Sequence, residues 1–171
     1  MGDVVTDASQ IMIAPLAAEE TSVAWRLLRE LARFEGREHE FALAEDDLYA
    51  NLFGPAQTAH ALLARWDGEP IGLALYYFTF PSFSGAPALW IEDLFVLPTY
   101  RGRGVGGALL RRLAHAAVER GCVRMEWWAL DWNADARAFY EKIGARARPE
   151  CIVYQLAGDA LNELSDEANE S

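Results

Sequence analysis

The glycine-rich segment Arg101–Gly107 is the feature that most constrains the fold of this chain. It follows Leu89–Leu97, a run rich in aromatic and β-branched residues that predicts a strand, and it leads into a helix predicted over Gly104–Arg120. Gly121 ends that helix, and Val123–Ala129 predicts a second strand. A strand, a helix and a strand in this order are typical of a βαβ unit, whose strands are parallel. The segment therefore favours an α/β layer architecture over a helix bundle.

Further strands and helices surround this unit. Asp67-Gly68 separates two apolar runs and is a strong signal for a β-hairpin, which makes two neighbouring strands antiparallel. The remaining apolar patterns predict strands over Ile11–Pro15, Ala59–Trp66, Pro70–Phe80 and Ile152–Leu156, and helices over Glu19–Phe34, Glu45–Leu52 and Asn133–Ile143. We therefore expect a mixed sheet with helices inserted between its strands.

Length and composition indicate one globular domain. The chain has 171 residues, of which 52% are hydrophobic and 24% charged, and domains usually contain about 100–200 residues. The one compositional break comes at Gly158, where the sequence becomes acidic and polar. We expect a single domain over residues 1–157 and a flexible acidic tail over residues 158–171.

Charge and cysteine usage limit the classes of partner. A formal net charge of −11 excludes a general affinity for nucleic acid or for an anionic membrane, and it favours a cationic small molecule. Cys122 and Cys151 are too few for a disulfide framework. The chain shows neither a secretion signal nor an apolar run of the roughly 18–20 residues that a membrane span needs. We expect a cytoplasmic protein without a membrane partner.

The glycine-rich segment has the composition of a phosphate site. Glycine lets the backbone approach a ligand closely, and the N-terminus of the following helix attracts an anion. Arg101 and Arg103 add positive charge in an otherwise acidic chain. A pyrophosphate is the predicted ligand. The alternative interpretation of this segment is a tight turn with solvated arginines. A Walker motif is absent because Ala108 follows Gly107, and the only lysine of the chain is Lys142.

Three linked motifs carry a resemblance to a known family. They are Ile91–Val96 followed by Arg101-x-x-Gly104-x-Gly106, then Asn133, and then Phe139–Ala145. They resemble the acetyl-CoA motif and the next motif of the GNAT superfamily of N-acetyltransferases. Tyr76–Thr79, Trp90–Val96 and Trp132-Asn133 are similar to the pattern of its diamine (spermidine/spermine) and thialysine acetyltransferase branch.

The resemblance implies a fold and a cosubstrate. The fold is a mixed, twisted sheet of about six or seven strands with helices on both faces, which opens after the fourth strand to admit coenzyme A. The cosubstrate is acetyl-CoA, no metal is required, and a homodimer is expected. The implied cofactor-binding residues are Leu94, Phe95, Val96, Arg101, Gly102, Arg103, Gly104, Val105, Gly106, Gly107, Asn133 and Tyr140.

Acetyl transfer to an amine requires a neutral amine, a polarised carbonyl and a proton for the leaving thiolate. A backbone N–H near Leu94 or Phe95 is the candidate that polarises the carbonyl. By resemblance, Glu92 is the candidate general base and Tyr140 the candidate acid. The alternatives are a structural carboxylate at a strand bulge and a tyrosine packed between helix and sheet. Asn133 is also a candidate N-cap.

The amine substrate is less well specified by the sequence. Asp93 and Glu92 are candidates for binding a cationic group, and Phe83 matches an aromatic residue that the polyamine branch uses near its substrate. The loop around Phe83 lacks that branch's acidic and tryptophan residues. A small primary amine, such as a diamine, a polyamine or a thialysine-like molecule, is the predicted substrate, attacked directly while both substrates are bound. The alternatives are a protein N-terminus, a lysine side chain or an aminoglycoside as acceptor, or a non-catalytic acyl-CoA-binding module.

Overall fold

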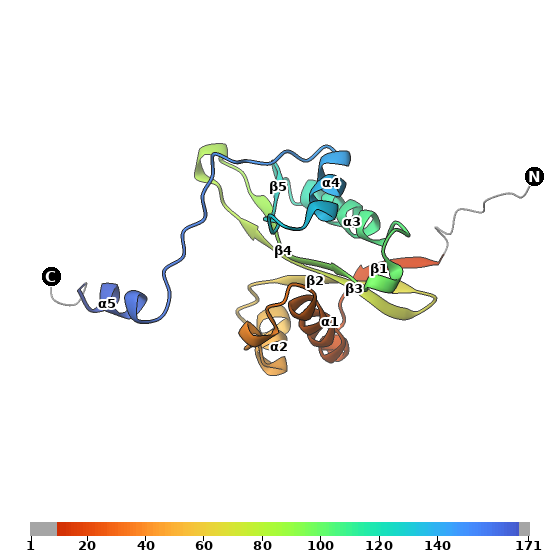
Figure 1. The fold of residues 1–171 in the computed structure, drawn as a ribbon, viewed down its shortest axis with the longest axis horizontal. Helices are drawn as coiled ribbons and strands as arrows, with labels where there is room; N and C mark the ends of the chain where they lie inside the picture. Colours follow the sequence, from red (N-terminus) through yellow and green to blue (C-terminus); the bar gives the residue numbers. More distant parts are fainter. Residues whose placement is uncertain (1–9, 168–171) are drawn as a thin grey trace, which may run out of the picture. The chain divides into compact units, whose positions relative to one another are not determined.

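The computed structural model describes residues 10–167, and its contacts divide the chain into two compact units, one ending at Trp128 and one beginning at Ala129. The first unit contains β1 (Ile11–Pro15), α1 (Thr21–Phe34), α2 (Glu45–Phe53), β2 (His60–Trp66), β3 (Glu69–Thr79), β4 (Ala88–Val96), α3 (Val105–Glu119) and β5 (Met125–Glu126). The second contains α4 (Ala134–Lys142) and α5 (Asp159–Glu167) (Figure 1). Short 3₁₀ turns lie at Ala18–Glu20, Glu38–Glu40, Ser82–Ser84 and Pro98–Tyr100.

The strands form one mixed sheet in the order β1-β2-β3-β4-β5. The first four strands are antiparallel, and β5 runs parallel to β4, so the βαβ prediction is confirmed. The hairpin predicted at Asp67-Gly68 is also present, and Asp67 adopts a left-handed conformation there with φ of 49°. Asp67 and Gly68 therefore join β2 to β3 through the tight turn that their sequence predicts.

The predicted number of strands was wrong. Among the described residues the sheet has five strands, not six or seven. The strand predicted over Val123–Ala129 shortens to Met125–Glu126, and Ile152–Leu156 is irregular. The side chains of Ile152, Val153 and Tyr154 are 72%, 81% and 88% exposed. A strand needs a neighbouring strand for its N–H and C=O groups, and Ile152–Leu156 pairs with no strand of the described chain.

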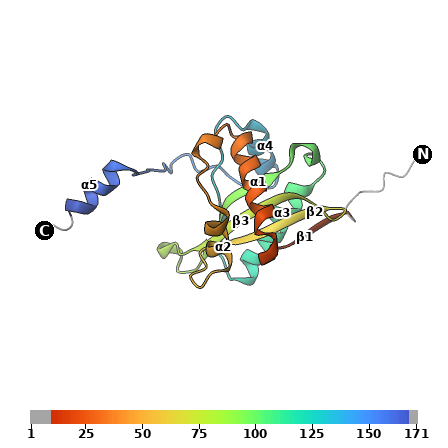
Figure 2. The same cartoon turned by 90° about the horizontal axis from the view of Figure 1, so that it is seen from below.

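Helices cover both faces of the sheet in the first unit, as expected. α1 and α2 lie against one face and α3 against the other (Figures 1 and 2). The α1 and α2 side is closed by a buried apolar cluster: Leu16, Ala24, Leu27, Leu28, Leu48, Leu52, Ala61, Leu63, Leu73 and Phe95. On α3, Val105, Leu109, Leu110, Leu113 and Ala117 are buried. Burying these side chains is the main favourable contribution to folding, at roughly 25 cal/mol per Å² of apolar surface.

The second unit is helical at both ends. Asn133 caps α4 as predicted, because its side-chain oxygen accepts a hydrogen bond from the Ala136 N–H at 3.3 Å. α5 begins just after Gly158, inside the segment predicted to be a flexible tail, and residues 168–171 of that segment lie outside the described residues. Within residues 10–167, no helix combines the length and the apolar character needed to cross a membrane.

Candidate active site

A β-bulge in β4 brings Glu92 and Asp93 to the same face of the sheet. Asp93 pairs with Leu75, but the next pair is Ile91 with Tyr76, so Glu92 is an extra residue in β4. Leu75 packs against the apolar cluster under α1 and α2, which places Asp93 on that side. Glu92 lines a pocket that also contains Leu75. Regular alternation would have sent the two carboxylates to opposite faces, and the bulge cancels that alternation.

Glu92 is oriented by two donors, one from the neighbouring strand β3 and one from its own strand β4. Its Oε2 accepts a hydrogen bond from the Tyr77 hydroxyl at 3.3 Å and one from the Trp90 indole N–H at 3.2 Å. Tyr77 and Trp90 face each other across β3 and β4. Burial and the negative charge of Glu92 raise the pKa of Tyr77, so its hydroxyl stays a donor at neutral pH. The carboxylate is therefore held in place through its Oε2 atom.

Asp93 titrates near neutral pH. Its pKa is raised to about 7, mainly by burial and then by the negative charges of Glu92 and Glu35, while Arg37 acts in the opposite direction. Arg37 is itself engaged by Glu40 at 2.7 Å and by Glu35 at 3.8 Å. Asp93 is therefore a poor permanent counter-ion, and it exchanges a proton readily at physiological pH.

Asp93→Asn is expected to stabilise the protein more at high pH than at low pH. The folded state holds the Asp93 proton more tightly than the unfolded chain, so wild-type stability is favoured in acid and falls as the pH rises toward about 7. The stability gain from Asp93→Asn should grow by about 3 kcal/mol between pH 5 and pH 8. Over about two pH units of that interval, the folded protein still holds the Asp93 proton that the unfolded chain has already lost. Urea unfolding at both pH values measures it. A gain that does not depend on pH would contradict the raised pKa.

A pocket of about 400 Å³ adjoins Glu92 on the α1 and α2 side of the first unit. It is lined by Leu43, Leu48, Asn51, Thr58, Ala59, Leu75, Tyr77 and Glu92. The Trp25 indole N–H donates to the Leu43 carbonyl oxygen at 2.8 Å and so fixes the loop that forms one wall. The pocket is largely apolar with one carboxylate, which is the usual construction of a small-molecule site.

The glycine-rich segment forms an open turn in front of α3. Gly102 and Gly104 have positive φ angles of 74° and 85°, and a Cβ atom added to either would meet no atom within 4 Å. Gly104 is the N-cap of α3, and the Ala108 N–H makes the first intrahelical bond to its carbonyl. The N–H groups of Val105, Gly106 and Gly107 therefore precede the bonded part of the helix. This arrangement can hold an anion.

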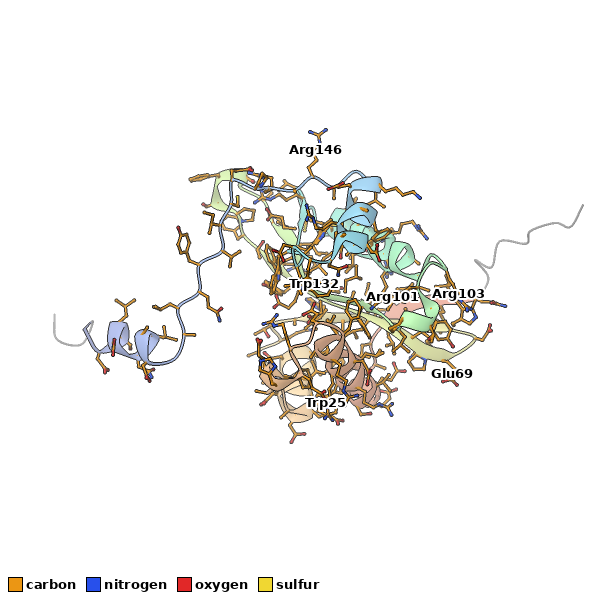
Figure 3. The ribbon with its side chains drawn as sticks, in the orientation of Figure 1. Trp25, Glu69, Arg101, Arg103, Trp132 and Arg146 are labelled. Carbon is orange, nitrogen blue, oxygen red and sulfur yellow. The ribbon has the colours of Figure 1, made fainter. Side chains whose placement is uncertain are left out.

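Arg101 and Arg103, both labelled in Figure 3, anchor this turn to aromatic side chains. The Arg101 guanidinium lies 3.9 Å from the centre of the Phe34 ring, and its Nε–H donates to the Val96 carbonyl oxygen at 3.0 Å. The Arg103 guanidinium lies over the rings of Trp66 and Tyr100, at 5.3 and 5.4 Å. Both cations are thus tied to the first unit beside the start of α3.

The second half of β4 has an open edge. β4 pairs with β5 only through Leu89 and Trp90, so the stretch up to Val96 pairs with no strand of the described chain on that side. The Leu97 N–H donates to the Ile71 carbonyl of β3. Hydrogen-bonded pairs alternate along an antiparallel ladder, so Leu94 and Val96 direct their N–H and C=O groups to the open edge. The groups of Phe95 point to β3, which leaves Leu94 as the better candidate of the two to polarise a carbonyl.

Tyr140 and Asn133 belong to the second unit. Tyr140 lies on α4 with its ring 5.6 Å from that of Phe139. Burial raises the pKa of the Tyr140 phenol above its ordinary value of 10, so the phenol keeps its proton throughout the physiological range. Such a group is available as a proton donor.

Phe83 lies apart from the pocket, and several pocket residues were not predicted. Phe83 sits in the loop between β3 and β4 and is fully exposed, and no residue of this loop is among those that line the pocket. No role was predicted for Tyr77, Leu43 or Thr58. Tyr77 lies within the Tyr76–Thr79 pattern that carries the family resemblance, which was its one sequence signal. The pocket walls depend on how α2 packs, which no local pattern encodes.

Comparison with known proteins gives concordant findings. The model of the acetyltransferase (GNAT) family matches residues 24–145. A thialysine N-epsilon-acetyltransferase from Bos taurus is 33% identical over 151 residues, which cover 82% of this chain and 88% of that protein. A spermidine/spermine N(1)-acetyltransferase-like protein from Homo sapiens is 32% identical over 70% of this chain and 18% of its own length. An integron cassette protein from the V. cholerae mobile metagenome has a similar structure, with a TM-score of 0.77, 28% identity, and coverage of 91% and 98% of the two chains.

Proposed function

Because the chain belongs to the GNAT family of acetyltransferases, we propose that it transfers an acetyl group from acetyl-CoA to the primary amine of a small cationic molecule. The relatives are named for thialysine and for spermidine and spermine, which are small amines. One observation carries the proposal. A single strand, β4, bears the oriented carboxylate Glu92 on one face and, at Leu94 and Val96, an edge with which no strand of the described chain pairs. The glycine turn follows this strand after one short 3₁₀ turn.

The residues of the glycine turn fit the pyrophosphate of coenzyme A. The positions where a Cβ atom would project are empty at Gly102 and Gly104, and the first N–H groups of α3 lie beside them. Arg101 and Arg103 add positive charge. We assign coenzyme binding to Arg101–Gly107, to the edge of β4 at Leu94 and Val96, and to Asn133 and Tyr140. Acetyl-CoA supplies the acetyl group as a reactive thioester.

The residues of β4 prepare the two reacting groups. The Leu94 N–H is directed to the open edge, where it stabilises negative charge on a carbonyl oxygen. Glu92 accepts a proton from the substrate ammonium, through water, and so frees the nitrogen lone pair. Attack is direct, because binding both substrates together supplies the proximity that a covalent enzyme intermediate would otherwise provide. Tyr140 holds a proton on its Oη atom for the leaving thiolate.

Amine-dependent release of free thiol tests the proposal. The protein is mixed with acetyl-CoA and, in separate reactions, with spermidine, thialysine, a straight-chain monoamine and a lysine-containing peptide. Turnover of at least one small amine, with release that depends on its concentration, supports the proposal. Turnover of the peptide alone would assign the chain to protein acetylation instead.

We further propose a homodimer in which Ile152–Leu156 of one copy adds to the sheet of the other. The segment combines β-branched and aromatic residues with side chains that are mostly exposed in the single chain. Val153→Lys should shift the molecular mass in solution from twice the chain mass to the chain mass, because a charge is costly in an apolar contact. Light scattering after gel filtration measures this, and the exposed Leu161→Lys serves as the control. A wild-type mass equal to that of a single chain would overturn the proposal.

A further inference from the structure

We propose that the pocket beside Glu92 selects a primary monoamine with an apolar body, an alkylamine or arylalkylamine, over diamines, polyamines and amino acids. The inference rests on the proposed function, since it names the substrate class of the same site.

The charge of the pocket lining matches one ammonium group. Glu92 is the only charged residue among the lining residues, and its Oε2 already accepts hydrogen bonds from Tyr77 and Trp90. Leu43, Leu48, Ala59 and Leu75 supply hydrocarbon surface. A ligand that places its nitrogen at Glu92 therefore buries its carbon atoms against these four side chains, and each methylene removed from water is worth up to about fourfold in affinity.

Among the described residues that line the pocket, there is no second carboxylate for a second ammonium group. The remaining polar side chains, Asn51 and Thr58, are uncharged. The Thr58 hydroxyl donates to the Asn51 side-chain oxygen at 2.5 Å, and the Asn51 amide donates to the Asp47 backbone carbonyl at 2.8 Å. Both side chains are exposed, so an ammonium group among them keeps its water but gains no carboxylate. An ammonium group that moves further in, against Leu43, Leu48 or Leu75, gives up its water without a partner, which is unfavourable.

An amino acid is disfavoured as a substrate because of its α-carboxylate. Its α-carboxylate needs a cation, and no lysine, arginine or histidine is among the described lining residues. Arg37 is near Asp93, but Glu40 and Glu35 already pair with it. The carboxylate would also be repelled by Glu92. The pocket therefore disfavours lysine-like substrates, although relatives of this chain are named for thialysine.

Three molecules with similar carbon chains separate these classes. Hexylamine carries one ammonium group, 1,6-diaminohexane carries two, and lysine carries two and a carboxylate. With the wild-type protein and saturating acetyl-CoA, kcat/KM for hexylamine should exceed that for 1,6-diaminohexane by about tenfold or more, and lysine should be the poorest. From propylamine to hexylamine, kcat/KM should rise about two- to fourfold per methylene.

A substitution at Thr58 tests whether the pocket itself sets this preference. Thr58→Asp adds a carboxylate to the pocket lining. Thr58→Asn adds an uncharged side chain of the same shape as aspartate. Thr58 is exposed, so both variants are compatible with folding. Thr58→Asp should lower the ratio of hexylamine to diaminohexane kcat/KM by about tenfold, and Thr58→Asn should leave it within about twofold.

The outcomes distinguish this inference from the proposed function. Turnover of 1,6-diaminohexane or lysine equal to or faster than that of hexylamine overturns the inference and leaves the amine acetyltransferase intact. Equal ratios for Thr58→Asp and Thr58→Asn also overturn it. If no amine is acetylated, the proposed function itself fails. The wild-type series gives a decision even if a variant does not fold, because it requires no substitution.

Discussion

Tyr140→Phe is expected to lower kcat by about 100-fold or more while the affinity for acetyl-CoA changes by less than about threefold. The substitution removes one hydroxyl and keeps the ring that packs 5.6 Å from Phe139. Burial raises the pKa of this phenol, so the wild-type group carries its proton at every pH at which the protein is assayed. A loss confined to turnover follows if that proton goes to the leaving thiolate.

The measurement pairs steady-state kinetics with a direct titration of acetyl-CoA. Tyr49→Phe is the matched control, because it removes a hydroxyl from an exposed tyrosine whose ring packs on Phe53 and does not line the pocket. It should leave kcat unchanged. A Tyr140→Phe protein with kcat within about threefold of the wild type would remove Tyr140 from the role of acid.

Gly104→Leu is expected to weaken acetyl-CoA binding by about 100-fold or more. Gly104 is the N-cap of α3, and a side chain there projects into space that is empty of protein atoms, where we place the pyrophosphate. The first N–H groups of the helix then lose access to the anion.

The same helix offers a matched control at its other end. Gly121 also has a positive φ, 72° against 85° for Gly104, and an added Cβ atom there also meets nothing within 4 Å. Both leucine variants should lose about 1–2 kcal/mol of unfolding free energy, since a left-handed residue with a side chain is strained. Only Gly104→Leu should lose affinity. Equal affinities of the two variants for acetyl-CoA would show that the turn does not bind it.

Much of the fold was predictable because its signals are local. The hairpin at Asp67-Gly68, the apolar stripe of α1 and the end of α3 at Gly121 follow from turn chemistry and helical periodicity, and the structure has each of them. The parallel pairing of β4 with β5 follows from the length of the segment between them. These features depend on neighbours in sequence.

The features that were not predicted depend on partners far away in sequence. Alternation along β4 separates Glu92 from Asp93, and only the register with β3 reveals the bulge that brings them together. Ile152–Leu156 has the composition of a strand, but composition does not supply a neighbour to pair with. The pocket walls at Leu43 and Leu48 depend on the packing of α2.

The proposed acetyl transfer requires the turn before α3 to bind the diphosphate of coenzyme A, and a calorimetric comparison of two thioesters tests this binding directly. Acetyl-CoA and acetyl-pantetheine carry the same thioester arm, but only acetyl-CoA has the pyrophosphate. We expect saturable binding of acetyl-CoA at a single site and an affinity for acetyl-pantetheine that is weaker by about 100-fold or more. Equal affinities for the two molecules, or no heat with acetyl-CoA, would show that the turn does not bind the diphosphate.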